Sequence, residues 1–274
     1  REGIPGGLRL SYATLGAFTK YPKASLPHKP SRHIADKKYG YFKANQASFE
    51  NIAKELGLQK RSDYGFERHP LVYLVEAADD ICYTLIDFED AINLKLISED
   101  YALENLINLV KHQIDTAKYR GLKTTADRLG YLRALAINTL VQDAVVLFES
   151  HESELLSGNF NSSLLDRSQY SAQVKDIIDL SVKYLYQSDE VIEKEIAGYR
   201  ILESLLEVFC NALVNKSLDQ ATAFDQLILK RFDFEAHDLP KDSIYLNLLE
   251  ASSFVASLSD SQAIQLHHTI KGLL

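Results

Sequence analysis

Residues 68–94, RHPLVYLVEAADDICYTLIDFEDAINL, form a long apolar segment that also carries six carboxylates. Pro70 is tolerated in the first turn of a helix, where its missing N–H is not needed, and His69 lies in the N-cap region. We therefore predict a central helix over residues 69–95. Apolar residues at helical spacing predict one buried stripe, formed by Leu71, Leu74, Val75, Ala78, Ile81, Cys82, Leu85 and Ile86.

Three polar residues of this segment fall on one line of the helix, because Asp79, Tyr83 and Asp87 are spaced at i, i+4 and i+8. A carboxylate beside a buried face needs a cation or hydrogen-bond donors, because unpaired burial of charge is costly. A metal-bound aspartate, followed by an aromatic ring and a hydrogen-bonding acid, would fit this line. A solvated acidic face is the alternative. Because no broad polar face remains, we expect some of these acids to point inward.

The string HPLVYLVEAADDICYTLIDFEDA resembles the fourth signature helix of the deoxyguanosinetriphosphate triphosphohydrolases, the dGTPase branch of the HD-domain phosphohydrolases. The resemblance implies that Asp79 is the last of four ligands of a divalent metal, Mg²⁺ or Mn²⁺. It also implies that Tyr83 packs against the deoxyribose and that Asp87 bonds the 3′-hydroxyl. The implied activity is hydrolysis of dGTP, or of dNTPs, to a deoxynucleoside and inorganic triphosphate.

Residues 1–48 are rich in loops and lysines. A solvated surface loop is the ordinary interpretation, but lysines beside Tyr21 and before Gly40 could also hold phosphates as point charges. REGIPGGLRLSYATLGAFTKYP and KKYGYF resemble two segments of the family. By position, Lys20 and Lys38 would contact the triphosphate and Tyr21 would lie at its phosphate end. The family has Pro where this sequence has Tyr39, so the loop differs there.

Most of the remaining sequence predicts helices. Ser48 is a good N-cap and Gly57 a good C′ residue for a short helix, and residues 58–67 form a polar link. Further helices are predicted at 98–119, 125–150, 170–187, 189–215, 218–231, 242–258 and 260–273. Strand signals are scarce. We predict an all-α protein with a multi-helix HD-domain-like core and a C-terminal helical bundle. Residues 1–120 would be the C-terminal part of the HD core, and residues 121–274 a helical C-terminal region that completes the nucleotide pocket and supplies oligomer contacts.

Two later positions resemble the family more weakly. EKEIAGYRILESLLEVF, residues 193–209, resembles a family helix whose acid lies near the base, which makes Glu195 a candidate. Arg231 is the nearest match to an arginine that contacts nucleotide in some members. A charge on a helix surface is the alternative for both residues.

The HD family binds its metal through His, then His-Asp, then a distant Asp. Here no His-Asp pair precedes Asp79, and the pair His237-Asp238 lies far downstream. We therefore expect the sequence to be the C-terminal part of a dGTPase-like enzyme, with three ligands and the catalytic residues upstream of Arg1. The alternative is a nucleotide-binding or oligomerisation module without hydrolysis. A third option, another phosphate ester as substrate, fits Tyr83 and Asp87 less well.

The 274 residues carry a net charge of −8, which argues against a nucleic-acid coat but allows a polyphosphate bound by a lysine cluster and a divalent cation. No apolar run of bilayer-spanning length and no secretory signal are seen. Cys82 and Cys210 are predicted to be small buried hydrophobic residues in a reducing compartment. We expect a cytoplasmic homo-oligomer with no membrane partner, and single-stranded DNA is a candidate effector.

Overall fold

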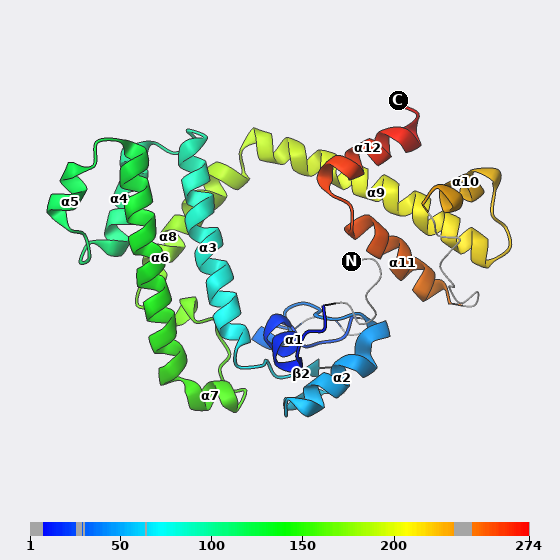
Figure 1. Cartoon of the computed structure of the whole chain (residues 1–274), viewed down its shortest axis with the longest axis horizontal. Coiled ribbons are helices and arrows are strands. Elements are labelled where there is room, and N and C mark those ends of the chain that lie inside the picture. Colours follow the sequence, from blue (N-terminus) through cyan, green and yellow to red (C-terminus); the bar gives the residue numbers. More distant parts are fainter. Residues whose placement is uncertain (1–7, 26–28, 30, 64, 233–242, 274) are drawn as a thin grey trace. The chain divides into compact units, whose positions relative to one another are not determined.

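The computed structural model describes residues 8–25, 29, 31–63, 65–232 and 243–273. It divides into two compact units, Arg1–Gln187 and Ser188–Leu274, called here the first and second unit. Helices dominate, and the strands among the described residues are β1 (Lys60–Ser62) and β2 (Gly65–Phe66), one antiparallel pair within the predicted polar link (Figure 1). The all-α prediction is confirmed. The predicted functional division at residue 120 stays a prediction.

The N-terminal part of the first unit holds α1 (Tyr12–Phe18) and α2 (Gln46–Glu55). The predicted N-cap at Ser48 is wrong. A 3-10 turn over Lys43–Asn45 leads directly into α2, so the backbone is already helical two residues before Ser48. Gly57 has φ +65° just after the helix, as its predicted C′ role requires.

The central helix is α3 (Val72–Asn93). The N–H of Leu71 donates to His69 Nδ1 at 3.2 Å, which confirms His69 in the N-cap region. The buried face of α3 is rotated from the predicted one because α3 packs against both α6 (Thr125–Ser150) and α8 (Ser171–Ser181). Ile81 and Leu85 of the predicted stripe are buried, whereas Leu71, Val75 and Ile86 are exposed.

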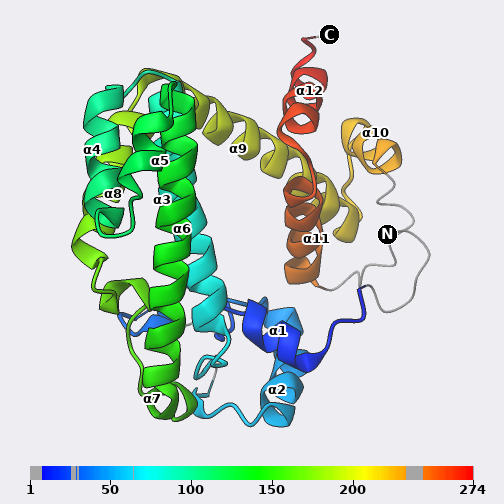
Figure 2. The ribbon, with the colours of Figure 1, turned by 60° about the vertical axis from the view of Figure 1, so that its left-hand side comes forward.

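The main core of the first unit lies among α3, α4 (Glu99–Val110), α6 and α8, which run alongside one another (Figure 2). The predicted single helix 98–119 is wrong, because Asp115 begins a separate helix, α5 (Thr116–Gly121). Its carboxylate accepts the N–H groups of Ala117 and Lys118 at 2.9 and 3.0 Å.

Helix α6 has the predicted bounds, 125–150. By length and composition it is the one described helix apolar enough to cross a membrane, which differs from the expectation that no segment reaches that apolar length. Leu132, Ala136 and Leu140 of α6 are fully buried in the main core. One face of α6 is thus packed into the core of the first unit, while Val141, Val145 and Val146 are exposed.

The first unit ends with α7 (Glu152–Leu156), a 3-10 turn (Leu165–Arg167), α8 and a π turn (Val182–Tyr186). The sequence predicts one continuous helix over 170–187, so the change from α to π geometry after Ser181 is an unpredicted feature. A π turn closes hydrogen bonds from i to i+5 and is frequent at functional sites.

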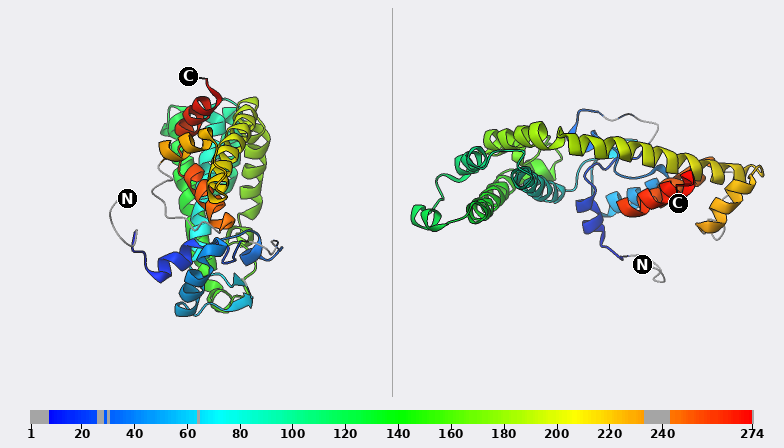
Figure 3. Two further views of the ribbon diagram at one scale, coloured as in Figure 1. Left: turned by 90° about the vertical axis from the view of Figure 1, so that its right-hand side faces the viewer. Right: turned by 90° about the horizontal axis from the view of Figure 1, so that it is seen from above.

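The second unit consists of α9 (Asp189–Ser217), α10 (Ala223–Arg231), α11 (Ile244–Ala256) and α12 (Asp260–Lys271), with α9 by far the longest (Figure 3). Its own core is centred on Phe209, which contacts Phe232 and Phe254 edge to face. The predicted start of α10 at residue 218 is wrong, because Asp219 has φ +55° and Thr222 caps the helix. The pair His237-Asp238 lies outside the described residues.

Both cysteines are free. Cys210 is partly buried, but Cys82 is exposed, so the prediction that both are buried is wrong for Cys82. The rotation of α3 described above explains this, because Cys82 lies on the same outward face as Val75 and Ile86.

Candidate functional site

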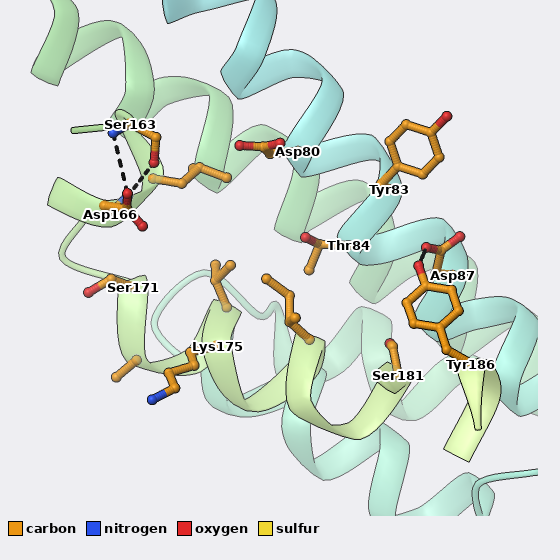
Figure 4. Close-up of a pocket in the computed structure, with 14 residues that line it drawn as sticks. Asp80, Tyr83, Thr84, Asp87, Ser163, Asp166, Ser171, Lys175, Ser181 and Tyr186 are labelled. Carbon is orange, nitrogen blue, oxygen red and sulfur yellow. Dashed lines mark hydrogen bonds between the residues drawn. The ribbon is translucent and has the colours of Figure 1, made fainter. Parts of the chain in front are cut away.

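A cavity of about 610 Å³ lies between α3 and α8 within the first unit (Figure 4). Its size is typical of small-molecule sites. One wall is α3, the opposite wall is α8 with the π turn, and the loop before α8 closes one end. The polar residues that line it are Asp80, Tyr83, Thr84, Asp87, Ser163, Asp166, Ser171, Lys175, Ser181 and Tyr186.

The structure brings together two of the three residues predicted on the line along α3. Tyr83 and Asp87 both line the cavity, with Asp87 partly buried and Tyr83 62% exposed. Asp79 is exposed and lies outside the lining, whereas its neighbour Asp80 faces the cavity. The helix turns by about 100° per residue, so the two adjacent aspartates lie on different faces of α3. The individual roles of Asp79, Tyr83 and Asp87 stay predictions.

Asp87 has a partner that sequence reasoning missed. The hydroxyl of Tyr186, at the end of the π turn, donates to Asp87 Oδ2 (Figure 4). Burial raises the pKa of Tyr186 to about 12, and the hydrogen bond and charge of Asp87 add to the rise. The phenol therefore stays protonated, and remains a donor, at neutral pH. No sequence signal marks Tyr186, because its position depends on the π turn.

Asp80 is the half-buried acid of the cavity. Burial raises the pKa of its carboxyl above the usual value. The charge of Lys20 opposes this rise, while the carboxylates of Glu76 and Asp79 add to it. Asp80 therefore ionises less readily than an exposed aspartate, and a nearby cation would stabilise its charged form.

A buried ion network fixes the predicted phosphate-binding residues beside α3. Glu76 is 8% exposed and pairs with Arg68 at 2.7 Å and with Lys20 at 3.1 Å. Arg68 also donates from Nε to the Lys20 carbonyl at 2.8 Å. Both cations lie over the Tyr21 ring, at 5.9 Å for Lys20 and 5.6 Å for Arg68. The expectation that some acids of α3 point inward is confirmed by Glu76.

Glu76 also sets the charge of Lys20. Burial disfavours the ammonium ion, but the hydrogen bond and charge of Glu76 outweigh this effect and raise the pKa of Lys20. Lys20 is therefore a fixed positive charge beside Glu76, and Glu76 lies one helical turn before Asp79 and Asp80 on α3.

Lys38 lies apart from this network. It is exposed and does not line the cavity. The loop that carries it is held by Lys23, which is 1% exposed, pairs with Asp36 at 2.5 Å and donates to the Lys29 carbonyl at 2.6 Å. The Tyr39 ring lies 5.6 Å from the Lys23 ammonium. Tyr39, at the position where the family has Pro, therefore contacts the lysine that holds this loop.

Glu195 and Arg231 belong to the second unit. Glu195 is exposed on α9. Arg231 ends α10, stacks its guanidinium on the Phe232 ring at 5.2 Å and lines a cavity of about 510 Å³ within that unit. Their roles toward a nucleotide stay predictions.

Comparison with known proteins identifies the relatives of this chain. No protein-family model matches it. It is 33% identical to a deoxyguanosinetriphosphate triphosphohydrolase-like protein of Synechocystis sp., over 98% of this chain and 61% of the relative. A protein of the same name from Pseudomonas aeruginosa is 32% identical over 97% and 61%, and a deoxyguanosinetriphosphate triphosphohydrolase of Yersinia pestis is 28% identical over 90% and 51%. The resemblance to the dGTPase family is confirmed.

The chain spans 51% to 61% of the length of these dGTPase relatives. Among its described residues, no three His, Cys, Asp or Glu side chains lie close enough together to hold a metal ion. Asp79 supplies one exposed carboxylate, and one carboxylate does not make a four-ligand site. The described residues therefore do not form a metal site by themselves.

Proposed function

We propose that the protein containing this chain hydrolyses dGTP, or dNTPs more generally, to a deoxynucleoside and inorganic triphosphate. One observation carries the proposal. Tyr83 and Asp87 line a single cavity of nucleotide size. The pairing of Lys20 with Glu76, two turns before Tyr83 on the same helix, is consistent with it. The names of the relatives support a phosphohydrolase of the dGTPase family.

In this proposal the residues of α3 and its neighbours bind and orient the nucleotide. Lys20 attracts the triphosphate as a point charge, with Tyr21 at the same end. Tyr83 packs against the deoxyribose where a 2′-hydroxyl would lie, and Asp87 accepts a hydrogen bond from the 3′-hydroxyl. A site built for such hydrogen bonds can discriminate strongly between sugars.

The remaining predicted contacts are part of the same proposal. Lys38 would reach the triphosphate, and Glu195 and Arg231 remain candidate nucleotide contacts. A divalent ion, Mg²⁺ or Mn²⁺, would bind Asp79 together with further ligands.

We also propose that the protein is a cytoplasmic homo-oligomer. An exposed apolar row on α9 supports the oligomer, since Ile196, Tyr199 and Leu202 are 61%, 78% and 47% exposed at consecutive turns of that helix. Such rows often mark contacts between proteins. Single-stranded DNA remains a candidate effector.

A second candidate is a nucleotide-binding or oligomerisation module that does not hydrolyse its ligand. The observation that favours it is the single predicted metal ligand among the described residues. A His…His-Asp ligand sequence elsewhere in the intact protein would favour the hydrolase, and its absence would favour the module.

The proposal is tested by incubating the intact protein with dGTP or GTP in Mn²⁺ and separating the products. We expect deoxyguanosine and triphosphate from dGTP, and turnover of GTP slower by about a hundredfold or more. Tyr83→Ala should narrow this difference, because Tyr83 lies where the 2′-hydroxyl of GTP would be, whereas Asp90→Asn, a change at an exposed acid of α3 outside the cavity, should not. Binding of dGTP without any product would instead support the module.

A further inference from the structure

The carboxylate of Asp87 is shared by two elements that are far apart in the sequence. Its Oδ2 accepts the hydroxyl of Tyr186, and both residues line the cavity together with Tyr83. Among the described residues, no hydrogen bond to Asp87 Oδ1 is present. One oxygen of the carboxylate is thus held by the protein, and the described residues supply no hydrogen-bond donor to the other.

The π turn is what brings Tyr186 to this place. Helix α8 follows ordinary geometry up to Ser181, whose hydroxyl donates to the Ile177 carbonyl at 3.1 Å. The turn then widens over Val182–Tyr186, and Tyr186 faces Asp87 across the end of the cavity (Figure 4). Because π turns are rare and frequently occur at functional sites, the presence of one beside a cavity points to a functional constraint.

We propose that Tyr186 is a positioning residue of the sugar site: its hydroxyl orients the Asp87 carboxylate so that Oδ1 accepts the 3′-hydroxyl of a deoxynucleotide. This inference rests on the proposed function and adds a third residue to the sugar site. A carboxylate on a single-bonded side chain rotates freely, and a donor on one oxygen fixes the plane in which the other oxygen accepts.

The chemistry of the donor suits this role. A hydroxyl that donates to a carboxylate forms a charge-assisted bond, which is stronger than a neutral one. The hydroxyl occupies only Oδ2, so Oδ1 keeps its capacity to accept a hydrogen bond from the sugar. Phenylalanine in place of Tyr186 would keep the ring that lines the cavity and remove only the donor.

The test is a double-mutant cycle in which one change is made in the protein and the other removes the 3′-hydroxyl of the nucleotide. Calorimetry measures the Kd of dGTP and of 2′,3′-dideoxyguanosine triphosphate for the intact protein, in EDTA so that the nucleotide stays intact. The variants are Tyr186→Phe and Asp87→Asn. Tyr184→Phe is the matched control, since it lies in the same π turn but does not line the cavity.

We expect Tyr186→Phe to weaken dGTP binding about tenfold, near the lower limit for a hydrogen bond to a charged group, and to leave dideoxynucleotide binding unchanged. In an Asp87→Asn background the same substitution should have no further effect on dGTP. Tyr184→Phe should change neither affinity.

Two results would overturn the inference, and they are distinguishable. If wild type prefers dGTP but Tyr186→Phe weakens both nucleotides equally, Tyr186 is merely structural and the proposed function stands. If wild type does not prefer dGTP to the dideoxynucleotide, the sugar site itself is absent, and the proposed role of Asp87 fails with it.

Discussion

The buried carboxylate of Glu76, on the central helix α3, binds the segment that ends near Pro22. Arg68 and Lys20 both bind it, and the side chain of Arg68 is 1% exposed. A buried charge that loses its partner is strongly destabilising, because neither water nor protein then solvates it. Lys20 is less affected, since its side chain is 34% exposed and can be hydrated. The network therefore stabilises this part of the fold and holds the proposed phosphate-binding lysine in place.

Glu76→Ala should lower the free energy of unfolding by about 3–5 kcal/mol, because it leaves Arg68 buried without its ion pair. The exposed acid Glu55 of α2 offers a matched control, and Glu55→Ala should change stability by less than about 0.5 kcal/mol. Urea unfolding followed by circular dichroism measures both. Equal, small effects for the two variants would show that the network does not stabilise the fold.

Asp80 gives a prediction that depends on pH. Its folded-state pKa is raised by burial, so ionisation costs the folded protein stability as the pH rises above the usual value of 3.8. Asp80→Asn should therefore stabilise the protein at about pH 7, and the gain should shrink as the pH falls to about 4. Urea midpoints at the two pH values test this, with Asp90→Asn as control. A gain that is the same at both values would contradict the assignment.

The same residues show what a single sequence can reveal about a site. Tyr83 and Asp87 were predictable because residues one turn apart on a helix lie on one face, and both line the cavity. Tyr186 was not predictable, since its contact with Asp87 joins residues 99 positions apart and depends on a π turn. Lys20 was predicted as a phosphate contact, but its partner Glu76 could not be chosen among the six acids of the central segment without the packing.

At the scale of elements, helices with long periodicity were predicted best. Helix α6 has the predicted bounds because apolar residues recur along its whole length. The predicted boundaries failed where a local side chain or backbone preference competes with periodicity, as at the Asp115 cap and at Asp219. The buried face of α3 was misjudged because α6 and α8 cover two sides of it, which a single apolar stripe cannot reveal.

Helix α10 depends on a capping box in which Thr222 and Asp225 bond each other's backbone N–H groups. Thr222→Ala should lower the stability of the second unit by about 1 kcal/mol. Ser252→Ala, in the middle of α11, is the control and should have little effect, because its hydroxyl bonds only the Leu248 carbonyl of its own helix. Thermal melting measures both variants, and equal melting temperatures for wild type and Thr222→Ala would argue against the cap.

At the scale of the molecule, the chain has two compact units, each with its own core. Phe88 is fully buried in the first unit and Phe209 in the second. Separate cores predict separate cooperative unfolding, in which a defect in one unit leaves the other protected. Sequence alone did not place this boundary, because α8, the π turn and α9 follow one another with almost no loop.

Phe209→Ala should destabilise the second unit by about 3–5 kcal/mol and speed amide exchange there. Exchange in the first unit should stay unchanged, and Phe88→Ala should give the reverse pattern. Hydrogen exchange with mass spectrometry resolves the two units by peptide. Loss of protection throughout the chain in either variant would show that the units unfold together.

The central claim is that α3 carries the nucleotide site of a triphosphohydrolase. The most direct test is triphosphate release from dGTP by the intact protein in Mn²⁺, compared between wild type, Asp79→Ala and the control Asp90→Ala. We predict release by wild type and by Asp90→Ala, and loss of release for Asp79→Ala, because the proposed metal would lose a ligand. Equal release by all three proteins, or release by none, would contradict the claim.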